Sequence, residues 1–317
     1  MIVSYSKKIA YLGARMGVET GRLAVRFLPR RWLYRFSDAL AHFGFYFVRG
    51  FRQRATKNLA VALGDQLDEA EIREIVRRSL QNFLRDCMEI AVALVLPAEQ
   101  LRSEIPLYGR ANLDAALAKG NGVIALSAHL GNFFLIGTRL AAEGYSTHVL
   151  VNQPRNGHFA RLMDHYRLQV GQKTIHARPR QDALRELGEV LKRKAVAVLI
   201  ADEHRKGSGI HVPFFGRTVL ARRGPATMAL RTGAAVVPVY LVRNGETLKL
   251  IIEPELALVR TGKKQAAIRE NILSMTQWLE RTVRTYPDQW NWMNIHWQDT
   301  PSGDVAAEKR QVQRLTS

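Results

Sequence analysis

The stretch Gly122-Val-Ile-Ala-Leu-Ser-Ala-His129-Leu-Gly-Asn-Phe-Phe134 decides the fold of this chain. Residues 122–128 form an apolar run without charge, which is typical of a strand buried on both faces. Gly131 and Asn132 then permit a tight turn into an apolar helix over 132–143. The pattern therefore predicts that His129 lies where a buried strand ends and a helix begins.

That position gives His129 a candidate role in chemistry. Sheets of α/β proteins hold their ligands where the carboxyl ends of the strands meet the helix N-termini. An imidazole gains and loses its proton near neutral pH, so His129 is a candidate general base. The competing interpretation is a histidine that only bonds a neighbouring loop.

From residue 105 onward, strand and helix patterns alternate, which predicts an α/β fold with a mostly parallel sheet flanked by helices. The expected strands are 122–128, 147–151, 196–201, 235–242 and 248–253. The expected helices are 111–119, 132–143, 157–170, 182–193, 223–232 and 265–285.

A second buried strand ends in two acids, Asp202 and Glu203. In a parallel sheet they lie at the same edge as His129, where a carboxylate fixes the tautomer of an imidazole. Asp202 is the first candidate for this task and Glu203 the second; pairing with Arg205 or capping a turn is the alternative. His204 and His211 follow no metal-ligand spacing, so no metal is predicted.

Three arginines are candidates for binding an anionic group of a substrate. Arg222 and Arg223 precede the helix that starts at Gly224-Pro225, and Arg155 follows another strand. A guanidinium beside a helix N-terminus suits a phosphate. A solvated basic pair is the alternative for Arg222 and Arg223.

Composition points to an anionic partner. The 317 residues include 47 Lys and Arg against 28 Asp and Glu, a net charge of +19. The first sixty residues alone hold twelve basic side chains and two acidic ones. A hydrophobic content of 47% supports a sizeable core. The single cysteine, Cys87, excludes an intramolecular disulfide framework.

The N-terminal part reads as helical and suited to a membrane surface. Basic residues interrupt the apolar pattern of 5–28, which excludes a clean membrane span or a cleaved signal peptide. Aromatic residues bordered by arginines over 32–51 favour an interfacial helix over a helical pair on the protein's own core. Two further helices are expected over 54–96, the second beginning after Asp68.

Three regions follow from these patterns. Residues 1–97 form a helical region that associates with membrane, 98–300 form the α/β domain, and 301–317 form a polar tail. Charge alone suggests nucleic acid, but the chain shows no recognisable nucleic-acid-binding motif, so no nucleic-acid partner is predicted.

Several motifs, in their order and spacing, resemble the bacterial lipid A late acyltransferases (the lauroyl/myristoyl transferase family) within the wider glycerolipid acyltransferases. The likeness covers roughly residues 20 to 298. Its pieces are Arg54-Ala-Thr-Lys-Asn58-Leu, Ser127-Ala-His129-Leu-Gly-Asn132, Asp164-His-Tyr-Arg167, Asp202 before Val212-Pro-Phe-Phe-Gly216, Gly224-Pro-Ala-Thr-Met-Ala-Leu-Arg-Thr-Gly233, and Pro287-Asp-Gln-Trp290-Asn-Trp292.

The resemblance implies an acyltransferase that moves an acyl chain from an acyl carrier protein or coenzyme A thioester to a lipid acceptor. It implies no cofactor besides that co-substrate. The enzyme is expected on an anionic membrane surface, peripheral or shallowly anchored at the cytoplasmic face of the inner membrane. His129 is then the base, N–H groups of the turn after it hold the oxyanion, and Asn132 and Arg167 join the arginines above in substrate binding.

The family signature is His-x4-Asp/Glu, but Phe134 stands five residues after His129. A phenyl ring cannot accept the imidazole N–H, so three explanations compete. Asp202 or Glu203 orients the ring, His129 works alone, or the protein has lost transferase activity and only binds lipid.

Overall fold

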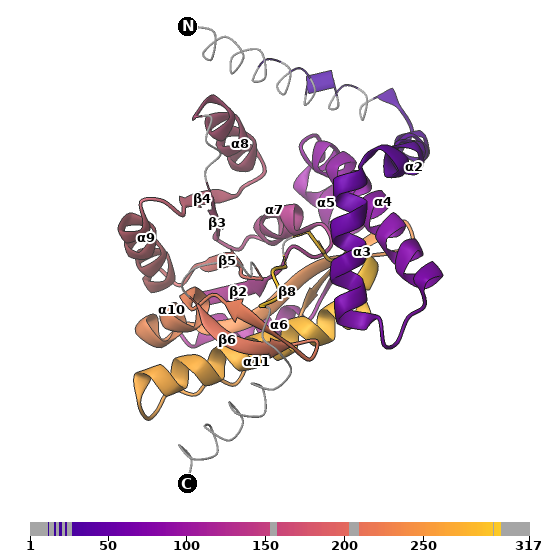
Figure 1. Cartoon of the computed structure of the whole chain (residues 1–317). Helices are drawn as coiled ribbons and strands as arrows, with labels where there is room; N and C mark the ends of the chain where they lie inside the picture. The colour runs from indigo at the N-terminus through magenta and orange to yellow at the C-terminus, as the bar shows by residue number, and fades with distance from the viewer. Residues whose placement is uncertain are drawn as a thin grey trace, which may run out of the picture.

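A seven-stranded sheet in the order β1-β9-β8-β2-β5-β3-β4 runs through the protein. Strands β2, β3, β4, β5 and β8 of this sheet are labelled in Figure 1. The strands are β1 (Leu107–Tyr108), β2 (Val123–Ser127), β3 (Thr147–Val151), β4 (Lys173–His176), β5 (Val196–Ile200), β8 (Ala235–Asn244) and β9 (Thr247–Ile252). Neighbouring strands are parallel except β8 and β9. The strands β6 (Ile210–Phe214) and β7 (Arg217–Ala221) form a separate antiparallel hairpin.

The computed structural model describes residues 27–152, 157–202, 209–293 and 295–298, together with Leu12, Met16, Glu19, Thr20 and Leu23. The predictions for Glu203, for Arg155, for most of the 5–28 segment and for the 301–317 tail fall outside these residues.

The central strand β2 is buried on both faces, as its sequence predicts. Ile124 and Leu126 point into one hydrophobic cluster, and Val123 and Ala125 point into another. Because side chains alternate along a strand, an uninterrupted apolar run supplies both sides of the sheet at once.

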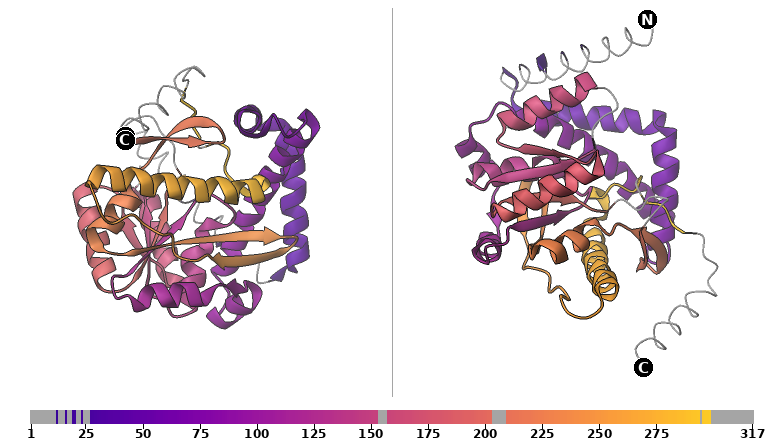
Figure 2. Two further views of the ribbon diagram at one scale, coloured as in Figure 1. Left: turned by 90° about the horizontal axis from the view of Figure 1, so that it is seen from below. Right: turned by 90° about the vertical axis from the view of Figure 1, so that its left-hand side faces the viewer.

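Helices cover both faces. The first cluster includes side chains from α9, α10 and α11, and the second includes side chains from α5, α6 and α7. Figure 2 shows α11 lying along the sheet. The bounds are α5 (Ala98–Glu104), α6 (Arg110–Ala118), η1 (Phe133–Leu135), α7 (Ile136–Ala142), α8 (Gly157–Gln169), α9 (Arg180–Lys192), α10 (Gly224–Thr232), α11 (Lys264–Thr285) and η2 (Pro287–Gln289).

Three more helices precede this part: α2 (Arg30–Phe47), α3 (Arg49–Leu63) and α4 (Glu69–Ala93). The predicted helix over 32–51 instead breaks at Val48, and α3 begins there. Asp68 caps α4 as predicted, since it accepts from the Glu71 N–H while the Glu71 carboxylate accepts from the Asp68 N–H. Leu59 of α3 and Val76 of α4 share the first cluster with the sheet.

The predicted α/β class with a mostly parallel sheet and a helical N-terminal part is confirmed. Every predicted strand is present, whereas β1, β4 and the hairpin β6–β7 were not predicted. The helix expected over 132–143 begins with the 3-10 turn η1 before α7. Within the described ranges, no helix combines the length and the apolar character needed to span a membrane.

Candidate active site

His129 and Asp202 meet at the edge of the sheet. Each follows the end of a strand, and the register of β2 with β5 pairs Ser127 with Ile200 just before them. The ring Nδ1 of His129 lies 2.7 Å from Asp202 Oδ1, and the His129 backbone N–H donates to Asp202 Oδ2 at 2.8 Å. The structure therefore brings together the imidazole and the first of its two candidate acids.

Asp202 is fixed from a third direction. The indole N–H of Trp290 donates to Asp202 Oδ2 at 2.8 Å, and the carboxylate is only 2% exposed. Burial raises the pKa of Asp202, but the His129 ring and the Trp290 N–H outweigh it and hold this pKa below its usual value. The carboxylate is thus ionised at neutral pH, which places the imidazole proton on Nδ1 and the lone pair on Nε2.

His129 lines a cavity of about 730 Å3. The imidazole is 19% exposed, so it sits in the wall of the cavity rather than in the core. Most of the lining is apolar and comes from several elements, including Phe51, Phe83, Phe134, Leu150 and Met293. A cavity of this size with a mainly apolar lining and several polar groups in its wall is typical of a site for a small or chain-like ligand.

Phe134, at the position for which the resemblance implies an acid, faces this cavity. Its side chain is 45% exposed and stacks on Phe133, with ring centroids 4.1 Å apart. Phe133 in turn meets the His129 ring edge to face at 4.8 Å. The carboxylate beside the imidazole comes from the end of β5, while the residue five positions after His129 adds apolar wall.

The turn after His129 depends on Gly131, which has a φ of +55°. A Cβ at this position would lie 2.0 Å from the carbonyl oxygen of Leu241, so no other residue fits without a backbone shift. The same close approach lets the Asn132 N–H donate to Leu241 O at 3.0 Å.

The predicted oxyanion site in the turn after His129 is wrong for three of the N–H groups of that turn. The N–H of His129 donates to Asp202, and those of Gly131, Asn132 and Phe133 donate to the carbonyls of Gln289, Leu241 and Gly131. These donors hold the turn in place, and none of them faces the cavity unpaired.

Asn132, predicted as a substrate contact, is fully buried and does not line the cavity. Its side-chain amide donates to the backbone oxygen of Asp86 at 3.2 Å and to Glu89 Oε2 at 3.1 Å. The residue therefore supports the turn from behind, by joining it to α4.

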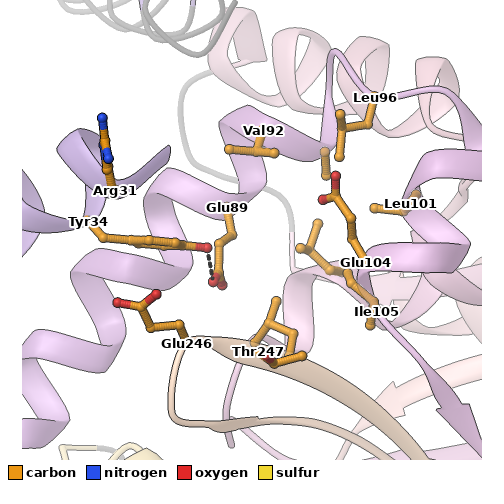
Figure 3. Close-up of a pocket in the computed structure, with 13 residues that line it drawn as sticks. Arg31, Tyr34, Glu89, Val92, Leu96, Leu101, Glu104, Ile105, Glu246 and Thr247 are labelled. Atoms are coloured by element: carbon orange, nitrogen blue, oxygen red, sulfur yellow. Dashed lines mark hydrogen bonds between the residues drawn. The ribbon is translucent and has the colours of Figure 1, made fainter. Parts of the chain in front are cut away.

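A buried ionic cluster lies behind the turn. Arg243 of β8 donates to Glu89 Oε1 at 2.6 Å and to Asp86 Oδ1 at 2.9 Å, and the three side chains are buried. Asp86 borders the His129 cavity, whereas Glu89 borders a second cavity of about 270 Å3. Figure 3 shows Glu89 in that second cavity, where it accepts from the Tyr34 hydroxyl of α2 at 3.0 Å.

Replacing Asp86 with asparagine is expected to change how stability depends on pH. Burial raises the pKa of Asp86 to about 7; the Arg243 charge opposes this shift and the Glu89 charge adds to it. The native state then holds a proton that the unfolded chain releases between about pH 4 and 7, so this carboxyl lowers stability as pH rises through that window. Thermal melts of both proteins should show that the melting temperature of Asp86→Asn rises relative to that of the parent from pH 5 to pH 8.

The exposed Asp182→Asn, on α9, is the control for that comparison. The melting temperature of this variant should change with pH in the same way as that of the parent. If the difference in melting temperature between Asp86→Asn and the parent stays constant from pH 5 to pH 8, the raised pKa of Asp86 is contradicted.

The predicted arginines fall in different places. Arg167 of α8 lines the His129 cavity and pairs with Asp164 at 3.0 Å. Arg222 borders a separate, much smaller cavity, and Arg223 is exposed and donates to Gln265 Oε1 at 2.5 Å. The structure therefore brings only Arg167, of these three, to the wall of the His129 cavity.

Two features of the site were not predicted. The first is Trp290, which is fully buried and whose indole is a direct partner of Asp202. The second is the buried ionic cluster of Asp86, Glu89 and Arg243. Its signal was two acids on the otherwise buried side of an amphipathic helix, where unpaired charge does not persist.

Comparison with known proteins places the chain among lipid-modifying enzymes. The family model described as bacterial lipid A biosynthesis acyltransferase matches residues 6–299. A phosphatidylinositol mannoside acyltransferase of Mycobacterium tuberculosis is 27% identical over 283 residues, which cover 87% of this chain and 86% of the relative. A lipid A biosynthesis palmitoleoyltransferase of Escherichia coli is 24% identical over 264 residues, which cover 81% and 82%.

Proposed function

Because this chain belongs to the bacterial lipid A biosynthesis acyltransferase family and is an acyltransferase, we propose that it transfers a fatty acyl chain from a thioester to a lipid acceptor with His129 as general base. The observation that carries this proposal is the His129–Asp202 pair in the wall of a largely apolar cavity. The donor is acyl carrier protein or coenzyme A, and no further cofactor takes part.

In the proposed reaction, Nε2 of His129 takes the proton of the acceptor hydroxyl while the oxygen attacks the thioester carbonyl. The imidazolium that forms is stabilised by ionised Asp202. The tetrahedral intermediate then collapses as the carbon–sulfur bond breaks. His129 returns its proton to the leaving thiolate, so base and charge balance over one cycle.

The cavity supports both substrates. Its apolar lining suits an acyl chain, since each buried methylene contributes about 0.8 kcal/mol. Arg167 offers a guanidinium for a phosphate or carboxylate of the acceptor. The lipids in the relatives' names, phosphatidylinositol mannoside and lipid A, support a lipid acceptor of this kind.

The enzyme is proposed to work on an anionic membrane surface, at the cytoplasmic face of the inner membrane. One face of α2 carries exposed apolar side chains at positions spaced four, four, three and four residues apart: Trp32, Phe36, Leu40, Phe43 and Phe47. Its opposite face is buried against the protein, through residues such as Leu33 and Ala41. A helix with apolar rings outside and basic neighbours is suited to the headgroup region of a bilayer.

Replacing Phe36 and Phe43 together with serine is expected to weaken binding to vesicles that contain phosphatidylglycerol by about tenfold or more, because two exposed rings leave the membrane. Sedimentation of protein with vesicles measures the change. The matched control is Tyr108→Ser with Val259→Ser, two exposed apolar residues outside α2. Equal binding by the two double variants would exclude α2 as the membrane face.

The proposed function is tested by incubating the purified protein with acyl-coenzyme A or acyl-acyl carrier protein and a bacterial lipid extract. Mass spectrometry should find lipids heavier by one acyl group. If no lipid gains mass with either donor, the proposed reaction is wrong.

A further inference from the structure

Arg54 and His296 form a polar pair next to residues that line the His129 cavity, at a place that we call its rim. Nη2 of Arg54, on α3, lies 3.0 Å from Nε2 of His296, near the end of the described chain. A guanidinium nitrogen only donates, so the imidazole accepts through Nε2. The Nδ1 atom of His296 is buried without a partner, and Arg54 is thus the polar contact that the structure gives this ring.

Arg54 and His296 each lie three residues along the chain from a residue that lines the cavity. Phe51 lines it one helical turn before Arg54, and Met293 lines it three residues before His296. Residues three apart on a helix share a face, so Arg54 lies beside the part of the wall that Phe51 forms, without itself lining the cavity. The two side chains therefore meet beside this part of the cavity wall, and Arg54 is exposed to solvent there.

No acid neutralises this rim among the residues that the structure describes. Arg54 is exposed and forms no ion pair with a carboxylate there, and the exposed Lys57 follows one turn later, also without one. In contrast, two arginines elsewhere in the described part of the chain have acidic partners, since Arg85 pairs with Asp38 and Arg243 with Glu89. The Arg54 guanidinium bonds the imidazole through Nη2 and keeps its remaining N–H donors for an anion.

The short stretch of chain between the His129 site and His296 sets an upper limit on the distance from the rim to the base. The backbone N–H of Asn291 donates to the His129 carbonyl oxygen at 2.9 Å, and His296 follows five residues later. Five residues span at most about 17 Å. The phosphopantetheine arm has about thirteen bonds between phosphorus and sulfur, which is similar to the length of four to five extended residues.

We propose that Arg54, positioned by His296 and assisted by Lys57, binds the phosphodiester of the donor's phosphopantetheine arm. This assignment rests on the proposed function and names the part of the donor that this rim recognises. Coenzyme A and acyl carrier protein share that phosphodiester, so one site serves both. With the phosphate at the rim, the arm enters along Phe51 and Met293 and brings the thioester to His129.

The test pairs variants with donors that have or lack the phosphate. Arg54→Gln and His296→Ala are compared with the parent on acyl-coenzyme A, on acyl-acyl carrier protein and on the acyl thioester of N-acetylcysteamine. Arg231→Gln is the matched control, because this exposed arginine ends α10 before β8 begins, at the opposite edge of the sheet. Steady-state KM and kcat are measured for each combination.

Arg54→Gln should raise KM about tenfold for both phosphate-bearing donors and leave kcat almost unchanged. His296→Ala should raise KM in the same direction by less, and Arg231→Gln should have no effect. With the N-acetylcysteamine thioester, all variants should equal the parent. An effect on coenzyme A alone would assign the site to its nucleotide phosphates, and an effect on the carrier protein alone would assign it to the protein surface; either would overturn the proposal.

A loss that persists with N-acetylcysteamine thioester would also overturn it, because the rim would then act without the phosphate. Absence of turnover by the parent with every donor would instead contradict the proposed function.

Discussion

His129→Ala is expected to lower acyl transfer by about a thousandfold, because the acceptor hydroxyl then loses the group that takes its proton. The loss should appear in kcat with both thioester donors. The readout is the initial rate of acyl transfer to the lipid acceptor in vesicles. His211→Ala is the matched control, since that histidine is exposed on the β6–β7 hairpin and should leave the rate unchanged.

Alanine also removes a ring that contacts Phe133, so the melting temperature of the variant is measured beside its rate. His129→Gln keeps much of the volume without a base and should be equally inactive. If either variant is folded and transfers acyl chains at the parent's rate, His129 is not the general base.

Asp202→Asn is expected to lower kcat by about a hundredfold to ten-thousandfold. The amide can turn its nitrogen toward His129 Nδ1, which puts the imidazole proton on Nε2, where the lone pair is needed. Trp290→Phe removes one donor to the same carboxylate and should cost several-fold, since the His129 contacts remain. Kinetics at neutral pH with saturating donor would rank the variants.

Glu203→Gln and the distant Asp182→Asn complete this series. Both should retain most activity, because Asp202 already occupies the position beside the ring. If Glu203→Gln were the inactive variant and Asp202→Asn the active one, the second candidate acid would take the orienting role.

The edge of the sheet that holds the site was predictable because its two strands have a clear sequence pattern. Residues 122–128 and 196–201 are apolar on both faces, and each run ends in a polar side chain. Parallel neighbours place such ends together, so the pairing of His129 with Asp202 follows from β2 lying beside β5. The acid could thus be identified although it stands 73 residues from the histidine.

The features that the sequence did not predict depend on contacts between distant residues, which a local sequence pattern does not contain. Lys173–His176 forms β4 with little apolar character, because an edge strand is paired on one side only. Asn132 reads as a polar group in a motif, yet the approach of the turn to Leu241 turns its side chain inward, toward α4. Trp290 reaches Asp202 from 88 residues away, through a bridge between Leu130 and Trp290 that no periodicity reveals.

The Tyr34–Glu89–Asn132 chain of hydrogen bonds has a consequence for acceptor choice. Tyr34 belongs to the helix proposed to lie in the bilayer surface, and Asn132 belongs to the turn that carries His129. Only Glu89 stands between them, so on the proposed membrane placement the depth of α2 would set the height of the imidazole above the lipid headgroups. Acceptor hydroxyls at that height would then be acylated in preference to those nearer the glycerol backbone.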